Sequence, residues 1–122
     1  MIDMRFAGRL AVAGLIAWGA AAAHAQTYPA KPIRIIVPSA PGSGPDIMAR
    51  SIGQKLNEAW GQPVIIDARP GAGGIIGSEL AAKAPPDGYT LIMGNAGSHS
   101  VNPSLYPKLA YDPLRDFAPV TL

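Results

Sequence analysis

The sequence contains no cysteine, few charged residues and no run of lysine or arginine: 15% of its 122 residues are charged and the net charge is +2. Without thiols the chain forms neither disulfides nor thiolate zinc sites, so its fold depends on a packed core. A nearly neutral chain also lacks the basic surface that nucleic-acid binding requires. These absences argue against a nucleic-acid partner and against a cysteine-based metal site.

The amino terminus has the three parts of a secretory signal peptide. Arg5 and Arg9 precede Leu10–Ala23, an uncharged run too short for a bilayer span of about 20 residues. The run ends in Ala23-His24-Ala25, the small-x-small pattern of a cleavage site. A buried helix is the alternative, but apolar residues surround this segment on all sides. We expect residues 1–25 to be a signal peptide cleaved after Ala25, leaving 97 residues from Gln26 in the periplasm.

All thirteen prolines and eleven of the fourteen glycines follow residue 25. Such a density sometimes marks disorder, but here these residues bunch between clean apolar runs. The runs and their spacing predict alternating strands and helices: strands at Ile33–Val37, Val64–Ile66 and Thr90–Met93, and helices at Asp46–Trp60 and Ile75–Lys83. This order predicts an α/β domain with a parallel sheet.

The first helix has apolar residues at spacings of three and four, which define one face. They are Ile47, Met48, Ile52, Leu56, Ala59 and Trp60. We expect Trp60, at the end of this face, to lie in the core.

Each strand opens into a loop rich in Gly and Ser, and two of these loops lead into helices. Ligands of parallel sheets bind beyond the carboxyl ends of the strands, where helix N-termini favour anions. Neither loop has the lysine of a P-loop, and Ile76 stands where the dinucleotide pattern that begins at Gly71 and Gly73 needs glycine. A carboxylate fits better, because a few backbone N–H groups and a hydroxyl satisfy it.

The chain after the signal peptide resembles the Bug family of periplasmic solute-binding proteins, the receptors of tripartite tricarboxylate transporters. Four blocks in the same order carry the resemblance: YPAKPIRIIVP with the PGSGPD loop, GQPVIIDARPGAGG, AKAPPDGYTL, and NPSLYPKLAYDPLRDFAPVTL. The resemblance implies a two-domain α/β binding protein of the type II periplasmic class, of which residues 26–122 form the N-terminal part of the first domain. It implies a small carboxylate or related solute as ligand and membrane components of the transporter as partners, with no cofactor, metal or catalytic residue.

The family holds its ligand at three loops, and their positions carry over to this sequence. The implied ligand-binding residues are Ser39, Gly42, Ser43, Gly44 and Asp46 in the first loop, Gly71, Ala72, Gly73 and Gly74 in the second, and Ala96, Gly97 and Ser98 in the third. The sequence departs from the family pattern at Ser39, Ser43, Ala68 and Ile75, where an aromatic residue, glycine, asparagine and a small polar residue are usual. The identity of the ligand therefore stays open.

Several of these residues have simpler structural roles available. Asp46 either pairs with Arg50 at i+4 or orients ligand and water. Arg69 either clamps a carboxylate or forms a surface ion pair. Ser98 is a possible hydroxyl donor, and His99 either caps or packs.

Two other classes of protein compete with a receptor. An enzyme would need a nucleophile beside His99, but adjacent residues such as Ser98 and His99 seldom hydrogen-bond to each other, and G-x-S-x-G is absent. A non-functional remnant of a receptor is the other alternative, because the chain stops where the family's crossover to the second domain would begin.

Overall fold

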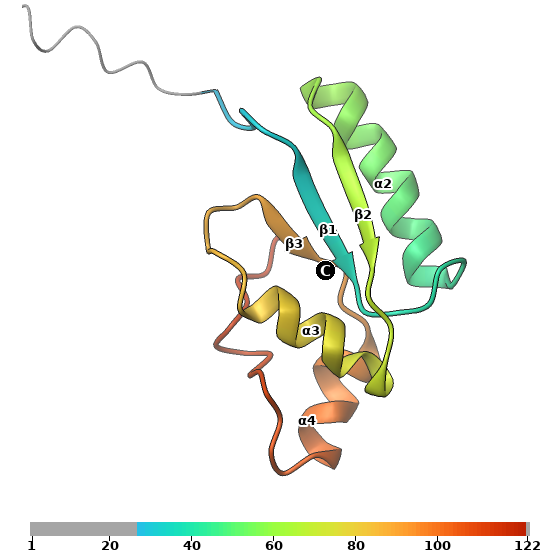
Figure 1. The fold of residues 1–122 in the computed structure, drawn as a ribbon, viewed down its shortest axis with the longest axis vertical. Coiled ribbons are helices and arrows are strands. Elements are labelled where there is room, and N and C mark those ends of the chain that lie inside the picture. Colours follow the sequence, from blue (N-terminus) through green and yellow to red (C-terminus); the bar gives the residue numbers. More distant parts are fainter. Residues whose placement is uncertain (1–26, 122) are drawn as a thin grey trace, which may run out of the picture.

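The computed structural model describes residues 27–121, so the predicted signal peptide lies outside the described residues. Three strands form one parallel sheet in the order β2-β1-β3 (Figure 1). The elements in chain order are β1 (Ile33–Val37), α2 (Gly44–Trp60), β2 (Val64–Ala68), η2 (Ala72–Gly74), α3 (Ile75–Ala82), β3 (Thr90–Ile92), η3 (Gly97–Val101) and α4 (Asn102–Leu105). The predicted α/β architecture and parallel sheet are confirmed.

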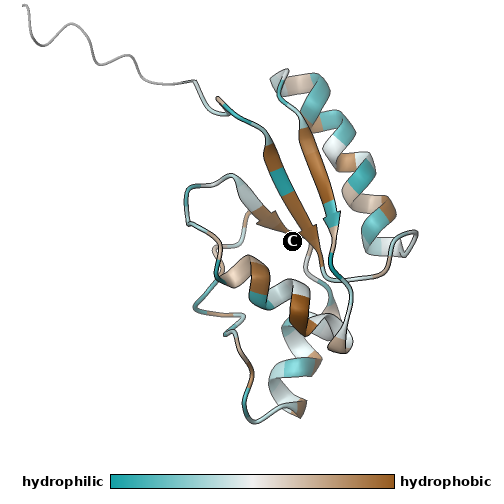
Figure 2. Ribbon diagram, viewed as in Figure 1, coloured by the Kyte–Doolittle hydropathy of each residue, from teal (hydrophilic) through white to brown (hydrophobic). Residues whose placement is uncertain are grey.

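The central strand β1 supplies most of the core. Ile33, Ile35 and Val37 on one face are at most 4% exposed and pack with Ala49 of α2. Ile36, on the other face, is fully buried, and α3 contacts both β1 and β3. The hydropathy colouring shows the apolar strands between helices of mixed character (Figure 2). Burial on both faces explains why this strand reads as a nearly continuous apolar run.

The face that the apolar residues of α2 define is not the face that this helix buries. Ile47, Met48 and Ile52 are 57%, 58% and 43% exposed, whereas the buried residues of this helix are Asp46, Ala49 and Gly53. The helix approaches the sheet closely: a Cβ at Gly53 would lie 3.0 Å from Ile66 Cδ1 and 3.2 Å from Val64 Cγ1. Small residues therefore occupy the contact, and the large ones remain outside.

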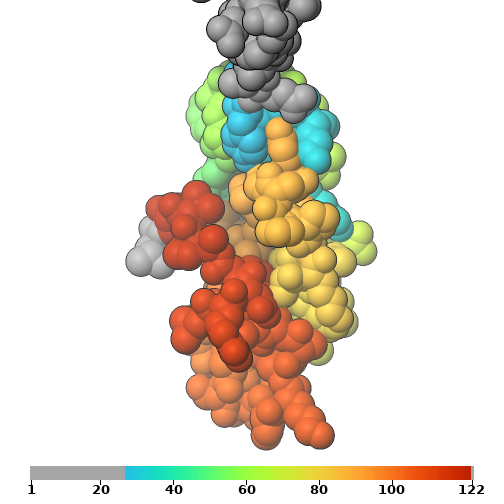
Figure 3. Space-filling model, turned by 90° about the vertical axis from the view of Figure 1, so that its left-hand side faces the viewer, coloured from blue at the N-terminus to red at the C-terminus, as the bar shows by residue number. Residues whose placement is uncertain are grey.

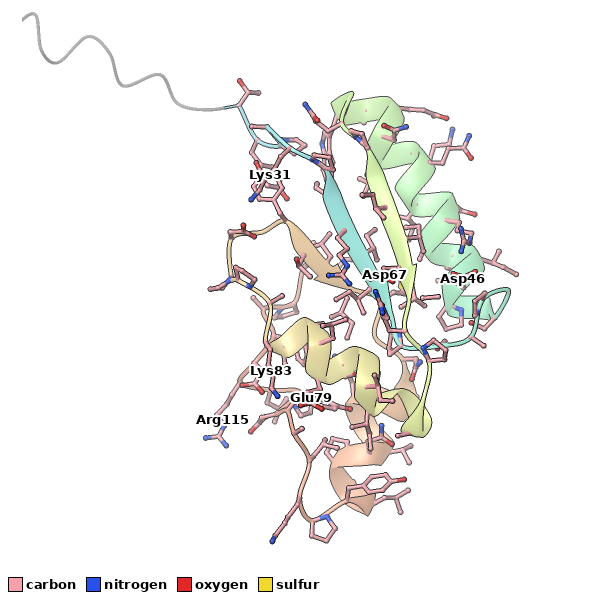
Figure 4. The ribbon with its side chains drawn as sticks, in the orientation of Figure 1. Lys31, Asp46, Asp67, Glu79, Lys83 and Arg115 are labelled. Atoms are coloured by element: carbon pink, nitrogen blue, oxygen red, sulfur yellow. The ribbon has the colours of Figure 1, made fainter. Side chains whose placement is uncertain are left out.

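Trp60 is also not in the core, because 39% of it is exposed. Its ring lies 6.1 Å from that of Tyr28, which in turn lies 5.1 Å from the ring of Tyr89. These three aromatic residues form a cluster at the amino end of the sheet, where Figure 4 also labels Lys31.

Two strand boundaries differ from the predicted ones. Strand β2 continues through Asp67 and Ala68, because Asp67 pairs with Arg34 of β1 and Ala68 is in register with Val37. Strand β3 ends at Ile92, although the Met93 N–H still donates to Ile36 O at 2.9 Å. Within residues 27–121, no helix has both the length and the apolar character needed to cross a bilayer.

Candidate functional site

The segments that follow the three strands meet at the carboxyl edge of the sheet. Asn95 Nδ2, after β3, donates to Ser39 Oγ, after β1, at 3.0 Å. Asn102 Nδ2, at the start of α4, donates to Gly73 O at 3.0 Å. A Cβ at Gly74 would lie 2.9 Å from Pro38 O and 3.7 Å from Ser98 Cβ. The structure thus brings the three predicted loops together.

The first loop enters α2 at Gly44, with Pro45 in the first helical turn, where its missing N–H costs nothing. Ser43 is the N-cap residue, but its side chain makes no capping hydrogen bond, and its buried Oγ has no hydrogen-bond partner among the described residues. Pro45, at the second helix position, has no N–H of its own, and Ser43 caps none of the other N–H groups of this turn. The start of this 17-residue helix therefore retains free donors.

Asp46 is 1% exposed and both of its carboxylate oxygens are engaged. Oδ2 accepts from Gly42 N at 2.9 Å and Arg50 Nε at 2.9 Å, and Oδ1 accepts from Arg50 Nη2 at 3.2 Å. The Arg50 guanidinium, with the Gly42 N–H, holds the pKa of this carboxyl below its ordinary value. Figure 4 shows Asp46 at the start of α2. The i+4 pair with Arg50 is present, and the bond from Gly42 N lets the same carboxylate shape the first loop.

The second loop has an unusual backbone. Gly71, Ala72, Gly73 and Gly74 have φ angles of 126°, 47°, 64° and 90°. Ala72 is the one residue of this run with a side chain, and L-residues seldom adopt a positive φ. The run turns the chain from β2 into the eight-residue helix α3, and Gly74 makes the close approach to Pro38 possible. Glycine is required here for backbone conformation as well as for space.

The third loop leads into a helix that the sequence analysis did not anticipate. The π-helix η3 continues directly into α4, so residues Gly97–Leu105 form one helical segment. Asn95 and Ser98 close its start reciprocally: Ser98 N donates to Asn95 Oδ1 at 2.9 Å, and Asn95 N donates to Ser98 Oγ at 3.1 Å. This arrangement resembles a capping box, and the Asn-x-x-Ser spacing was the available signal.

Ser98 and His99 are hydrogen-bonded, contrary to the expectation for adjacent residues. Ser98 Oγ lies 2.8 Å from His99 Nδ1, and the His99 ring centroid lies 5.2 Å from that of Phe117. Burial lowers the pKa of His99 and favours the neutral ring. However, Ser98 is fully buried and its Oγ also bonds to Asn95 N and Asn95 O. A buried hydroxyl with three neighbours serves packing and capping, and it is not placed to attack a substrate.

Arg69 forms an ion pair at the surface. Its Nε donates to Asp67 Oδ1 at 2.8 Å, while Arg34 pairs with the other oxygen of the same carboxylate. Burial raises the pKa of Asp67, but the hydrogen bonds from Arg34 and Arg69 outweigh that effect and lower it. Arg69 is thus held by a neighbouring strand residue.

Two hollows in the surface lie away from the three loops. One is lined by residues 103–116, and the other lies between α2 and β2. In the space-filling view the orange and red residues after β3 continue the surface formed by yellow α3 (Figure 3). Among residues 27–121, no three His, Asp or Glu side chains gather as a metal site would require.

The sheet order and the loops at its carboxyl edge are those of a periplasmic binding protein domain. Residues 48–122 match the model of the tripartite tricarboxylate transporter family receptor, and the chain belongs to this family. It is similar to Protein BugT of Bordetella pertussis, with 43% identity over 114 residues that cover 93% of this chain and 34% of BugT. The chain therefore spans about a third of the length of the curated relatives it matches.

Solved structures agree with this assignment. A periplasmic transporter has a TM-score of 0.75 and 49% identity, covering 77% of this chain and 32% of its own. MatC from Rhodopseudomonas palustris with bound malate has a TM-score of 0.72 and 42% identity, covering 76% and 32%. An R. palustris protein with adipate has a TM-score of 0.68 and 39% identity, covering 71% and 29%. The resemblance to the Bug family is confirmed at the level of the family.

Proposed function

We propose that the three loops at the carboxyl edge of the sheet bind the carboxylate of a small organic acid. The observation that carries this proposal is their convergence: Asn95 ties the third loop to Ser39, and Asn102 ties the second loop to the third. Each loop also leads into a helical segment whose first N–H groups point away from the helix body. Converging donors and partial positive charge favour an anion.

The proposed contacts are mainly to backbone. The proposed ligand-binding segments are Ser39–Asp46, Gly71–Gly74 and Ala96–Ser98, as the family pattern implies. Because the side chains of Asp46 and Ser98 are buried and engaged, they act by shaping the first and third loops. Hydrogen bonds to a charged acceptor contribute about 1.5 to 3 kcal/mol each, so a few N–H groups suffice to hold a carboxylate.

The wider proposal is a receptor outside the cytoplasm. In it, residues 1–25 direct export to the periplasm, and residues 26–122 are the N-terminal part of the first ligand-binding domain. The captured solute passes to the membrane components of a tripartite tricarboxylate transporter. Family membership and the similarity to proteins solved with malate and adipate support this proposal. A binding role without catalysis also fits the buried position of Ser98.

A titration of the isotope-labelled chain tests the site. We expect malate and adipate to shift the backbone amide resonances of the three loops, while their diamides, which lack the negative charge, shift them far less. Gly73→Val, which forces a β-branched residue into a φ of 64°, should weaken the response, and Val101→Ala on an exposed helical position is the control. Equal responses to acid and diamide, or no response from the loops, would refute the carboxylate site.

A further inference from the structure

The strongest unassigned feature is the hydrogen bond between Asn95 and Ser39, which joins residues 56 positions apart. Ser39 lies two residues beyond β1 and Asn95 three residues beyond β3. These strands are neighbours in the sheet order β2-β1-β3, and the chain crosses from β1 to one side and then returns past it to the other. The pair therefore lies at the topological switch point, where parallel α/β sheets bind ligands.

The orientation of the Asn95 amide follows from its partners. Oδ1 accepts from Ser98 N at 2.9 Å, so the NH₂ group must be the end that faces Ser39 Oγ. The Asn95 backbone is fixed as well: its N–H donates to Ser98 Oγ, and its carbonyl accepts from His99 N at 3.0 Å. This side chain has little freedom to rotate or flip.

The Ser39 hydroxyl is consequently an acceptor toward Asn95 and keeps its own proton for another partner. Among the described residues, no acceptor lies within hydrogen-bonding distance of that proton, and Ser39 is half-buried. A hydroxyl that accepts one hydrogen bond becomes a stronger donor of its own. Asn95 occupies one of the two acceptor lone pairs of this hydroxyl, and the hydroxyl proton stays available to an acceptor on the ligand.

We propose that Ser39 is a specificity-determining donor to a carboxylate oxygen of the ligand and that Asn95 is its positioning residue. The inference rests on the proposed function, because it needs a carboxylate at this edge. Asn95 orders the Ser39 hydroxyl before the ligand arrives, which reduces the entropic cost of binding. The pair favours an ionised carboxylate over a neutral acceptor, because a hydrogen bond to a charged acceptor is the stronger one.

The test is a double-mutant cycle on the full chain, with malate and malate diamide as probes and amide resonances as the readout. Ser39→Ala removes the donor. Asn95→Ser keeps a residue type that caps helices but cannot supply the amide. We expect Ser39→Ala to weaken malate binding about tenfold and to weaken diamide binding less, because the amide oxygen is a neutral acceptor. Asn95→Ser should weaken malate binding less, and the double variant should match Ser39→Ala.

A control variant and the possible results distinguish a failure of this inference from a failure of the proposed function. Ser104→Ala removes a hydroxyl from an exposed helical position, where Oγ donates to Ser100 O at 3.3 Å, and this variant should bind malate as wild type does. If wild type binds malate and Ser39→Ala binds it equally well, the inference fails and the carboxylate site survives. Additive losses in the double variant would overturn the positioning role of Asn95. A wild-type chain that does not respond to malate would remove both proposals.

Discussion

The two ends of the sheet are built from different residues. At the amino end, the ring of Tyr28 contacts those of Trp60 and Tyr89, and Lys31 Nζ lies 4.4 Å from the centroid of the Tyr89 ring. At the carboxyl end, asparagine side chains bond to Ser39 and to Gly73 O, and two glycines, Gly74 and Gly77, lie close to the backbone of Pro38. Half-exposed rings tolerate substitution because neighbouring side chains have room to move. Close backbone contacts do not tolerate added atoms, because the backbone cannot move aside. We therefore expect a side chain added at the carboxyl end to lower the free energy of unfolding more than the loss of an aromatic ring at the amino end.

The largest effect should come from Gly77→Val at the carboxyl end. A Cβ at this position would lie 2.6 Å from Arg69 O and 2.9 Å from Pro38 Cα. Both are backbone atoms, which cannot move away without a large cost in free energy. We expect the free energy of unfolding to fall by about 3 kcal/mol or more in urea denaturation. Gly44→Ala is the matched control, because nothing lies within 4 Å of its Cβ, and it should change stability by at most about 0.5 kcal/mol. Similar stabilities for the two variants would contradict the close packing of α3.

At the amino end, Trp60→Ala should have an intermediate effect. A fully buried aromatic residue costs about 3 to 5 kcal/mol when truncated to alanine. Because Trp60 is 39% exposed and contacts Tyr28 edge to face, we expect a loss of about 1 to 2 kcal/mol. Urea denaturation followed by circular dichroism measures it. A loss within the range for a buried residue would place Trp60 in the core after all.

Features that depend on a local sequence pattern could be predicted from the sequence. β-branched runs bounded by proline and glycine located all three strands, and the i+4 spacing of Asp46 and Arg50 anticipated their ion pair. The buried face of α2 was not predictable from hydrophobicity, because close approach to β2 selects Ala49 and Gly53 over larger residues.

The same limit applies to the candidate site. Glycine-rich loops after the strands could be read from the sequence, but the residues that hold them together could not. Asn95 and Asn102 are neutral polar residues, and their partners lie 56 and 29 residues away. Such pairing arises from the sheet order, which no local pattern specifies. The π-helix beginning at Gly97 was missed because its start depends on the Asn95–Ser98 cap, without an apolar face that repeats.

A smaller effect at the carboxyl end should appear as a pH dependence. Burial lowers the pKa of His99 below its ordinary value of about 6.5, so the unfolded chain takes up the proton first as the pH falls. The stability contributed by the neutral ring is complete above about pH 6.5 and is lost progressively below it, with a slope of at most about 1.4 kcal/mol per pH unit. His99→Gln should flatten this part of the curve between pH 7.5 and 5.5. The carboxyls of Asp46, Asp67, Asp87 and Asp112 have lowered pKa values and titrate below this window. An unchanged slope in the variant would mean that His99 is not the responsible group.

The smallest effect should come from Lys31→Met at the amino end. Lys31 Nζ pairs with Asp87 Oδ2 at 3.0 Å, but the two side chains are 58% and 41% exposed, and exposed ion pairs contribute little because water screens them. Methionine keeps the apolar stem near Tyr89 and removes the charge. Asp87 also retains the Tyr89 N–H at 3.0 Å, the largest cause of its lowered pKa, so that pKa should rise only part of the way toward its ordinary value. Denaturation midpoints at low and high salt and an NMR titration of Asp87 measure both effects. A large, salt-sensitive loss of stability would show that charge holds the amino end together, and that packing of the rings does not.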